Sequence, residues 1–176
     1  MKITTLLLVL GSLSGCSAPD TIEVRAAHGD LEAQATLGGL YANGDGVPED
    51  DVEAVRLFRM AAEGGLPRAQ FYLACMYGGG KGVPKDHEAA ANWYRKAADQ
   101  GMPEAQFYLA CLYEEGTGVP KDLGEARRWM SLAAEQGLVE AVEYMPGIGR
   151  LITPEELEAS RRFGELLEAT ELQQGN

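Results

Sequence analysis

Two cysteines are the side chains of this sequence most suited to nucleophilic chemistry, and they lie in nearly identical surroundings. Cys75 belongs to ACMYGGGKGVPKD at 74–86 and Cys111 to ACLYEEGTGVPKD at 110–122. A catalytic thiolate needs a base, most often a histidine. His28 and His87 each stand alone beside an expected helix end, and neither has metal-ligand spacing to a cysteine or to the other histidine. We therefore interpret both histidines as surface residues and expect no catalytic residue, cofactor or metal.

The glycine-rich stretch GGGKGV at 78–83 suggests a phosphate-binding loop, but its spacing does not fit one. Lys81 is not followed by Ser or Thr, and no glycine lies five residues before Gly80. We interpret these glycines as turn residues, because glycine takes positive φ at no steric cost.

Charge excludes one class of partner. The chain has 176 residues, long enough for one domain, with 27 acidic and 15 basic side chains and a net charge of −12. Nucleic acids require a basic face, so we expect no nucleic-acid partner.

The amino terminus has the pattern of a processing signal. Lys2 precedes the short apolar run ITTLLLVL, which is too short for a permanent membrane span. The following LSGC at 13–16 resembles the lipobox of bacterial lipoproteins, which implies cleavage after residue 15, acylation of Cys16 and export. Ser17 after the cysteine resembles the sorting rule for the outer membrane, facing the periplasm. The alternative is an ordinary secretory signal with a coincidental cysteine.

The chain repeats itself every 36 residues. A period in the mid-thirties is typical of helical solenoids. The recurring positions are Ala33, Ala69, Ala105 and Ala141; Leu37, Leu73 and Leu109; Tyr41, Tyr77 and Tyr113; and the turns GDGVP, GKGVP and GTGVP at 44–48, 80–84 and 116–120.

Each unit contains two amphipathic helical patterns joined by the glycine turn. Pro67 and Pro103 suit the first turn of the first helix, and the first glycine of each turn suits its left-handed end. Three aspartates are expected to cap the second helix, with glutamates completing a capping box in two units. These are Asp50, Asp86 and Asp122, with Glu53 and Glu125.

The pattern resembles the Sel-one-like repeat family, relatives of the tetratricopeptide repeats. The resemblance implies an all-α, right-handed α/α superhelical solenoid of antiparallel helix pairs. Gly38 matches the family pattern, whereas Ala74 and Ala110 depart from it. The expected divisions are a signal at 1–15, a tether and partial capping helix at 16–32, repeats at 33–68, 69–104 and 105–140, and a partial repeat with a capping helix at 141–176. That last helix is expected to start at Thr153.

Cys75 and Cys111 are expected to remain free thiols. Equivalent helices in a stack lie about 8–10 Å apart, which exceeds the reach of about 7 Å for an unstrained disulfide. Some family members are Cys-rich with disulfides inside each helix pair, but the second helices here contain no cysteine.

Helical periodicity places Phe71 and Cys75 opposite the stripe formed by Ala69, Leu73 and Tyr77. By resemblance this side lines the concave surface, and we hypothesise a shallow groove that receives a peptide or another protein. The alternative is that curvature buries the phenylalanines as core. The groove candidates are Ala35, Gly39, Asn43, Phe71, Cys75, Glu104, Phe107, Cys111, Glu114 and Glu115.

The expected function is a non-enzymatic adaptor, monomeric and tethered to the membrane only through acylated Cys16. Cys-rich relatives suggest a β-lactamase-like or penicillin-binding alternative. That chemistry uses SxxK, and no serine after residue 16 is followed by Lys at the third position. A purely structural role in an envelope complex is the remaining alternative.

Overall fold

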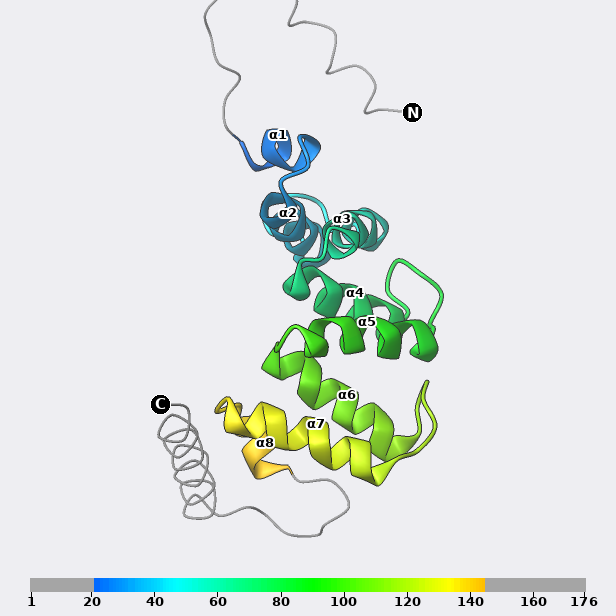
Figure 1. The fold of residues 1–176 in the computed structure, drawn as a ribbon. Helices are drawn as coiled ribbons and strands as arrows, with labels where there is room; N and C mark the ends of the chain where they lie inside the picture. Colours follow the sequence, from blue (N-terminus) through cyan, green and yellow to red (C-terminus); the bar gives the residue numbers. More distant parts are fainter. Residues whose placement is uncertain (1–20, 145–176) are drawn as a thin grey trace, which may run out of the picture.

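The computed structural model describes residues 21–144, and all regular structure within that range is α-helical. The helices stack in chain order along one axis (Figure 1). They are α1 (Ile22–Ala27), α2 (Leu31–Asn43), α3 (Asp51–Glu63), α4 (Pro67–Gly79), α5 (His87–Asp99), α6 (Pro103–Glu115), α7 (Leu123–Glu135) and α8 (Val139–Glu143).

Each helix packs against its neighbours in the chain, so the stack is a solenoid. The three full pairs are α2 with α3, α4 with α5, and α6 with α7, while α1 and α8 are short helices at the two ends. This confirms the predicted all-α solenoid. The short α1 occupies the place of the predicted partial capping helix, whereas the helix expected at Thr153 lies outside the described residues.

The turns follow the predicted chemistry. Gly44, Gly80 and Gly116 end the first helices with φ of 72°, 70° and 77°, in the left-handed region. Pro67 and Pro103 begin α4 and α6, where the missing N–H costs nothing.

The predicted aspartate caps are present, but the capping boxes are not. Oδ1 of Asp50 accepts hydrogen bonds from the N–H groups of Val52 and Glu53 at 3.0 Å. In a capping box, Glu53 would accept from the Asp50 N–H. That N–H instead donates to the Tyr41 carbonyl of the preceding helix at 3.0 Å, and Glu53 pairs with Arg56 at 2.6 Å. Because the Asp50 N–H already bonds to the other helix of the pair, it is not available to Glu53, and the prediction of a capping box there was wrong.

The third unit differs from the prediction in the same way. The Asp122 N–H donates to the Tyr113 carbonyl at 2.9 Å, and Glu125 pairs with Arg128 at 2.9 Å. In both units the N–H of the capping aspartate thus donates to a carbonyl of the preceding helix, where a capping box would have it donate to the glutamate.

In the second and third turns, the second glycine presses against the preceding unit. Gly82 has φ of 65°, and a Cβ added to it would overlap the backbone carbonyl of Asp51 at the start of α3. Gly118 has φ of 71° and meets the carbonyl of His87 at the start of α5 in the same way. Gly46, in the first turn, has open space around it. The turn is therefore also a contact between consecutive units.

Small side chains at fixed positions let the helices approach closely. Ala54, Ala61, Ala69, Ala97 and Ala105 are at most 1% exposed. Larger side chains fill the remaining space between them, and the largest that are fully buried are Phe58, Leu73, Leu109 and Met130. The buried residues form three clusters along the stack, and the partly buried Tyr77 and Trp93 pack against two of them.

Buried glutamines connect the units through hydrogen bonds. Gln106 donates to the Ala98 carbonyl at 3.2 Å, and its Oε1 accepts from Gln136 at 2.8 Å. Gln70 repeats both bonds, to Ala62 at 3.1 Å and from Gln100 at 2.8 Å. The amide thus adds a second hydrogen bond to a carbonyl near the end of a helix in the preceding unit.

The first unit lacks half of this arrangement. Gln34 donates to Ala26 at 3.0 Å, but its buried Oε1 has no partner among the described residues. Gly64 stands where the later units have Gln100 and Gln136. Leu31 occupies that space, since a Cβ on Gly64 would lie 2.5 Å from a Leu31 methyl group.

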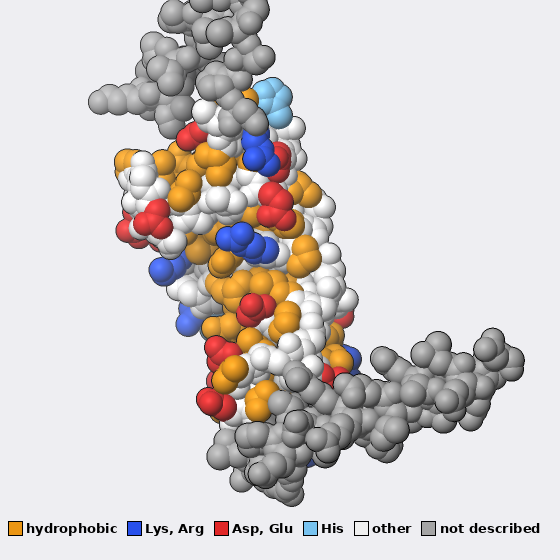
Figure 2. Space-filling model, turned by 90° about the vertical axis from the view of Figure 1, so that its left-hand side faces the viewer, with side chains coloured by type: hydrophobic (Ala, Val, Ile, Leu, Met, Phe, Trp, Pro, Cys, Tyr) orange, Lys and Arg blue, Asp and Glu red, His pale blue; other side chains and the backbone are white. Residues whose placement is uncertain are grey.

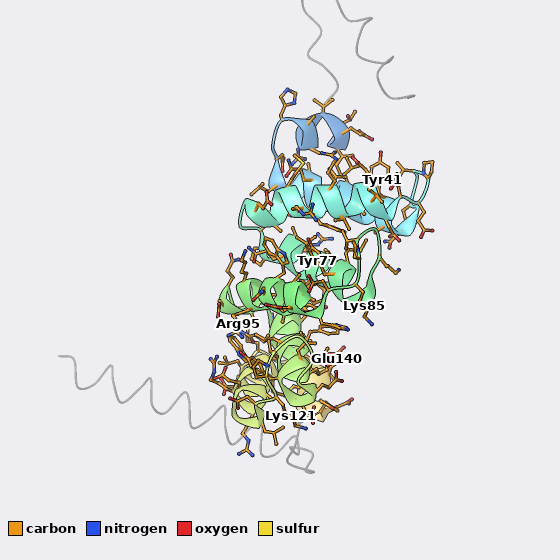
Figure 3. The ribbon with its side chains drawn as sticks, turned by 90° about the vertical axis from the view of Figure 1, so that its right-hand side faces the viewer. Tyr41, Tyr77, Lys85, Arg95, Lys121 and Glu140 are labelled. Carbon is orange, nitrogen blue, oxygen red and sulfur yellow. The ribbon has the colours of Figure 1, made fainter. Side chains whose placement is uncertain are left out.

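Tyrosines near the carboxyl ends of the first helices form a second set of contacts between units. Figure 3 shows Tyr41 and Tyr77 at successive levels of the stack, on the side seen in that view. The guanidinium of Arg59 donates to the Tyr77 hydroxyl at 2.9 Å, and that of Arg95 donates to Tyr113. These bonds join the second helix of one unit to the first helix of the next.

Candidate functional site

Four aromatic rings form a continuous line over α4 and α6. We call Phe71, Tyr72, Phe107 and Tyr108 the aromatic strip. Ring centroids lie 5.6 Å apart for Phe71–Tyr72, 5.6 Å for Phe71–Tyr108 and 5.5 Å for Phe107–Tyr108. Figure 2 shows one face on which hydrophobic side chains gather along the stack, with isolated acidic and basic groups among them.

The strip continues into other elements at both ends. Phe58 of α3 stacks on Tyr72 with centroids 5.2 Å apart, and Tyr144, just after α8, meets Phe107 at 6.2 Å. Such ring contacts contribute about 0.5–1.5 kcal/mol beyond burial. The rings therefore form a fixed surface.

A first pocket of about 410 Å³ lies between α2, α3 and α4 beside Tyr72. Three of the predicted groove residues line it: Gly39, Asn43 and Cys75. Its polar lining also includes Arg68, Lys81 and Asp51, and its apolar lining includes Phe58, Ala42, Met76 and Gly79.

A second pocket of about 190 Å³ lies over α6 and the start of α8. Its lining brings together three predicted groove residues, Phe71, Glu104 and Phe107, with Tyr108, Leu138 and Glu140. The phenylalanine rings are half-buried, packed against the core below and lining the pocket above. Phe71 and Phe107 thus contribute both to the core and to the surface of the pocket.

Other predicted groove residues have different surroundings. Ala35 is 1% exposed and packs in the core with residues of α3 and α4, so the expectation that it lines the groove is corrected. The carboxylate of Glu114 accepts a hydrogen bond from the Tyr144 hydroxyl at 2.9 Å, while that of Glu115 accepts one from Thr117 at 3.2 Å. Cys111 is half-buried against the core.

Sequence reasoning missed Tyr72, Tyr108, Arg68 and Glu140. A helical wheel centred on Leu73 sets the tyrosines between the two apolar sides, so they were assigned to neither. The signal was the dipeptide Phe-Tyr, which recurs at 71–72 and 107–108.

Both cysteines of the stack are free thiols, as predicted. Burial raises the pKa of Cys75, whose Sγ lies 3.2 Å from the Tyr94 hydroxyl. Burial, with the nearby charges of Glu114 and Glu115, raises the pKa of Cys111 to about 11. Both groups are therefore protonated at neutral pH, and neither has the lowered pKa of a nucleophilic cysteine.

The described residues include neither a metal cluster nor a membrane-spanning helix. Between residues 21 and 144, no three His, Cys, Asp or Glu side chains cluster as a metal site would require. Within the same range, none of the helices has the length and apolar character needed to cross a membrane.

The 36-residue period corresponds to a known repeat. The profile of the Sel1 repeat matches residues 31–66, 67–102 and 103–138. The chain belongs to the Sel1 repeat family. The matched Sel1 units begin two residues before the expected starts at 33, 69 and 105, at the first residues of α2, α4 and α6. A comparison with curated proteins found no match.

Solved Sel1 repeat structures resemble this one. A Sel1 repeat protein from Oxalobacter formigenes is 48% identical over 68% of this chain and 90% of its own, with a TM-score of 0.63. A protective antigen of uropathogenic Escherichia coli strains, with an SLR fold, is 40% identical over 69% of this chain and 26% of its own, with a TM-score of 0.68.

A third structure shows likeness of fold alone. The cysteine rich protein B of Helicobacter pylori is 21% identical over 68% of this chain and 91% of its own, with a TM-score of 0.54.

Proposed function

We propose that this Sel1 repeat protein is a non-enzymatic adaptor that binds another protein or a peptide along the aromatic strip. The observation that carries the proposal is the joining of four rings from consecutive first helices into one surface, on which Tyr108 is 46% exposed. Aromatic side chains are enriched where proteins bind one another. A solenoid offers such a surface over a long distance without a deep cavity.

The enzymatic alternative receives no support from the side chains of the stack. Ser131 is followed by Ala134 rather than by the lysine of an SxxK pair. The protonated thiols of Cys75 and Cys111 are not activated by a base. We therefore place the function in binding.

The adaptor would act at the bacterial outer membrane, facing the periplasm and held by acylated Cys16. The motif LSGC and the following Ser17 support this part of the proposal. Cells grown with an alkyne fatty acid are expected to label the protein, and Cys16→Ala is expected to abolish the label. Equal labelling of the variant would contradict the anchor.

Photo-crosslinking in intact cells tests the binding surface. With benzoylphenylalanine in place of Tyr108, we expect a discrete crosslinked product whose partner is identified by mass spectrometry. The matched control carries the same group in place of Val52, which is 67% exposed on α3 and outside both pockets. The same partner captured equally from both positions, or from Val52 alone, would contradict the proposal.

A further inference from the structure

One position at the start of every first helix changes its charge along the stack. At the 36-residue period, Glu32, Arg68, Glu104 and Glu140 are equivalent, and so are Tyr72 and Tyr108 one helical turn later. In the second unit the guanidinium carbon of Arg68 lies 5.5 Å from the centre of the Tyr72 ring. That distance is within the range of a cation–π interaction. The chain thus supplies its own cation to Tyr72.

The third unit has the same ring without the cation. Glu104 replaces the arginine, and within residues 21–144 no Lys or Arg lies over Tyr108. Tyr94 stacks on Tyr108 with centroids 5.5 Å apart and planes 7° from parallel. Because Tyr108 is still 46% exposed, much of its surface remains available.

The second pocket gathers further groups that favour a cation. The planes of the Phe107 and Phe71 rings make angles of 85° and 58° with the plane of Tyr108. The three rings that line the pocket therefore face in different directions. Glu104 and Glu140 line the same pocket, and in the described part of the chain neither carboxylate has an ion-pair partner. Figure 3 shows Glu140 in the lower part of the stack.

We propose that the second pocket binds a lysine or arginine side chain of the partner, between the carboxylates of Glu104 and Glu140 and against the ring of Tyr108. This inference rests on the proposed function and names the chemistry of the partner. Charge complementarity supports it, because two unpaired carboxylates beside aromatic faces attract a cation and repel an acidic segment. The occupant would take the place that Arg68 has over Tyr72.

Two small peptides test the site directly on the full-length protein. We expect Ac-Ala-Lys-Ala-NH₂ to shift the NMR signals of Tyr108 and Phe107 saturably, in the millimolar range expected for a single exposed subsite. The matched peptide with norleucine in place of lysine keeps the aliphatic chain without the ammonium group, and we expect it to give no saturable shift. Glu104→Gln with Glu140→Gln is expected to weaken lysine-peptide binding about tenfold or more.

Two further variants complete the test. Glu104→Arg is expected to abolish peptide binding, because the new arginine would cover Tyr108 as Arg68 covers Tyr72. Glu135→Gln, which removes an exposed charge from α7, is expected to leave binding unchanged.

Equal shifts with the two peptides, no saturable shift, or unchanged binding by the Glu104→Gln, Glu140→Gln variant would overturn the inference. The crosslink from position 108 separates this failure from failure of the adaptor proposal. If that crosslink persists in the double variant while the lysine peptide does not bind the native protein, the adaptor stands and only the cation site fails. If the peptide binds but no partner is crosslinked, the adaptor proposal fails.

Discussion

Replacing Gly118 with alanine is expected to lower the free energy of unfolding by about 3 kcal/mol or more, from left-handed backbone strain together with overpacking. The residue has φ of 71°, and the new Cβ would overlap the backbone carbonyl of His87. A backbone atom at the start of α5 cannot move aside as a flexible side chain does. Chemical denaturation monitored by circular dichroism measures the loss.

Gly46→Ala is the matched control for this substitution. Gly46 has a similar φ of 76° but nothing within 4 Å of the added Cβ. Its cost should be only the backbone strain, about 1–2 kcal/mol. Equal losses for the two variants would show that the second turn glycine serves conformation alone and not the contact between units.

Gln106→Ala is expected to cost about 2–4 kcal/mol, because it removes a buried side chain together with two hydrogen bonds between helices. The lost bonds are those to the Ala98 carbonyl and from the Gln136 amide. Thermal and chemical unfolding of the full chain measure the effect.

Gln34→Ala provides the comparison. Gln34 makes one of the two bonds, to Ala26 in the six-residue α1, and its Oε1 is already buried without a partner. Its substitution should cost at least about 1 kcal/mol less than that of Gln106, since one hydrogen bond contributes about that amount. A larger loss at Gln34 would contradict the account of the glutamine contacts.

Features determined within a few residues of one helix end were predictable from sequence. The aspartate caps, the prolines at Pro67 and Pro103 and the left-handed glycines depend on backbone conformation within a few residues of each position. Features determined by a neighbouring element were not. Glu53 fits a capping box by spacing, but the donor it would satisfy already bonds to Tyr41 in the other helix.

The site was predictable to a similar extent. Helical periodicity identified Phe71 and Phe107, yet it treated Ala35 as their equivalent in the first unit although that residue is buried. Nothing in periodicity reports how tightly a superhelix curves. The glycine at position 38, where the later units have alanine, also has a packing cause: a Cβ there would lie 3.0 Å from the ring of Phe58. The equivalents of Phe58 in the later units are Tyr94 and Met130, beside Ala74 and Ala110.

The stack therefore separates two tasks among its residues. Turn glycines, alanines and buried glutamines hold consecutive units in register, and these groups recur with little change. The position occupied by Arg68, Glu104 and Glu140 lies at the pockets, where its charge does not affect the core. Under the proposed binding mode, variation at such a position would change what the surface binds without changing the fold.

The central claim is that the partner binds along the aromatic strip. Hydrogen–deuterium exchange tests it most directly, measured on the protein alone and on its non-covalent complex with the partner that crosslinking identifies. If the aromatic strip is the binding surface, exchange should slow on binding in α4, α6 and α8, with little change along α3 and α7. Slowed exchange in α3 and α7 with α4 and α6 unaffected would place the partner on the other side of the stack and contradict the account.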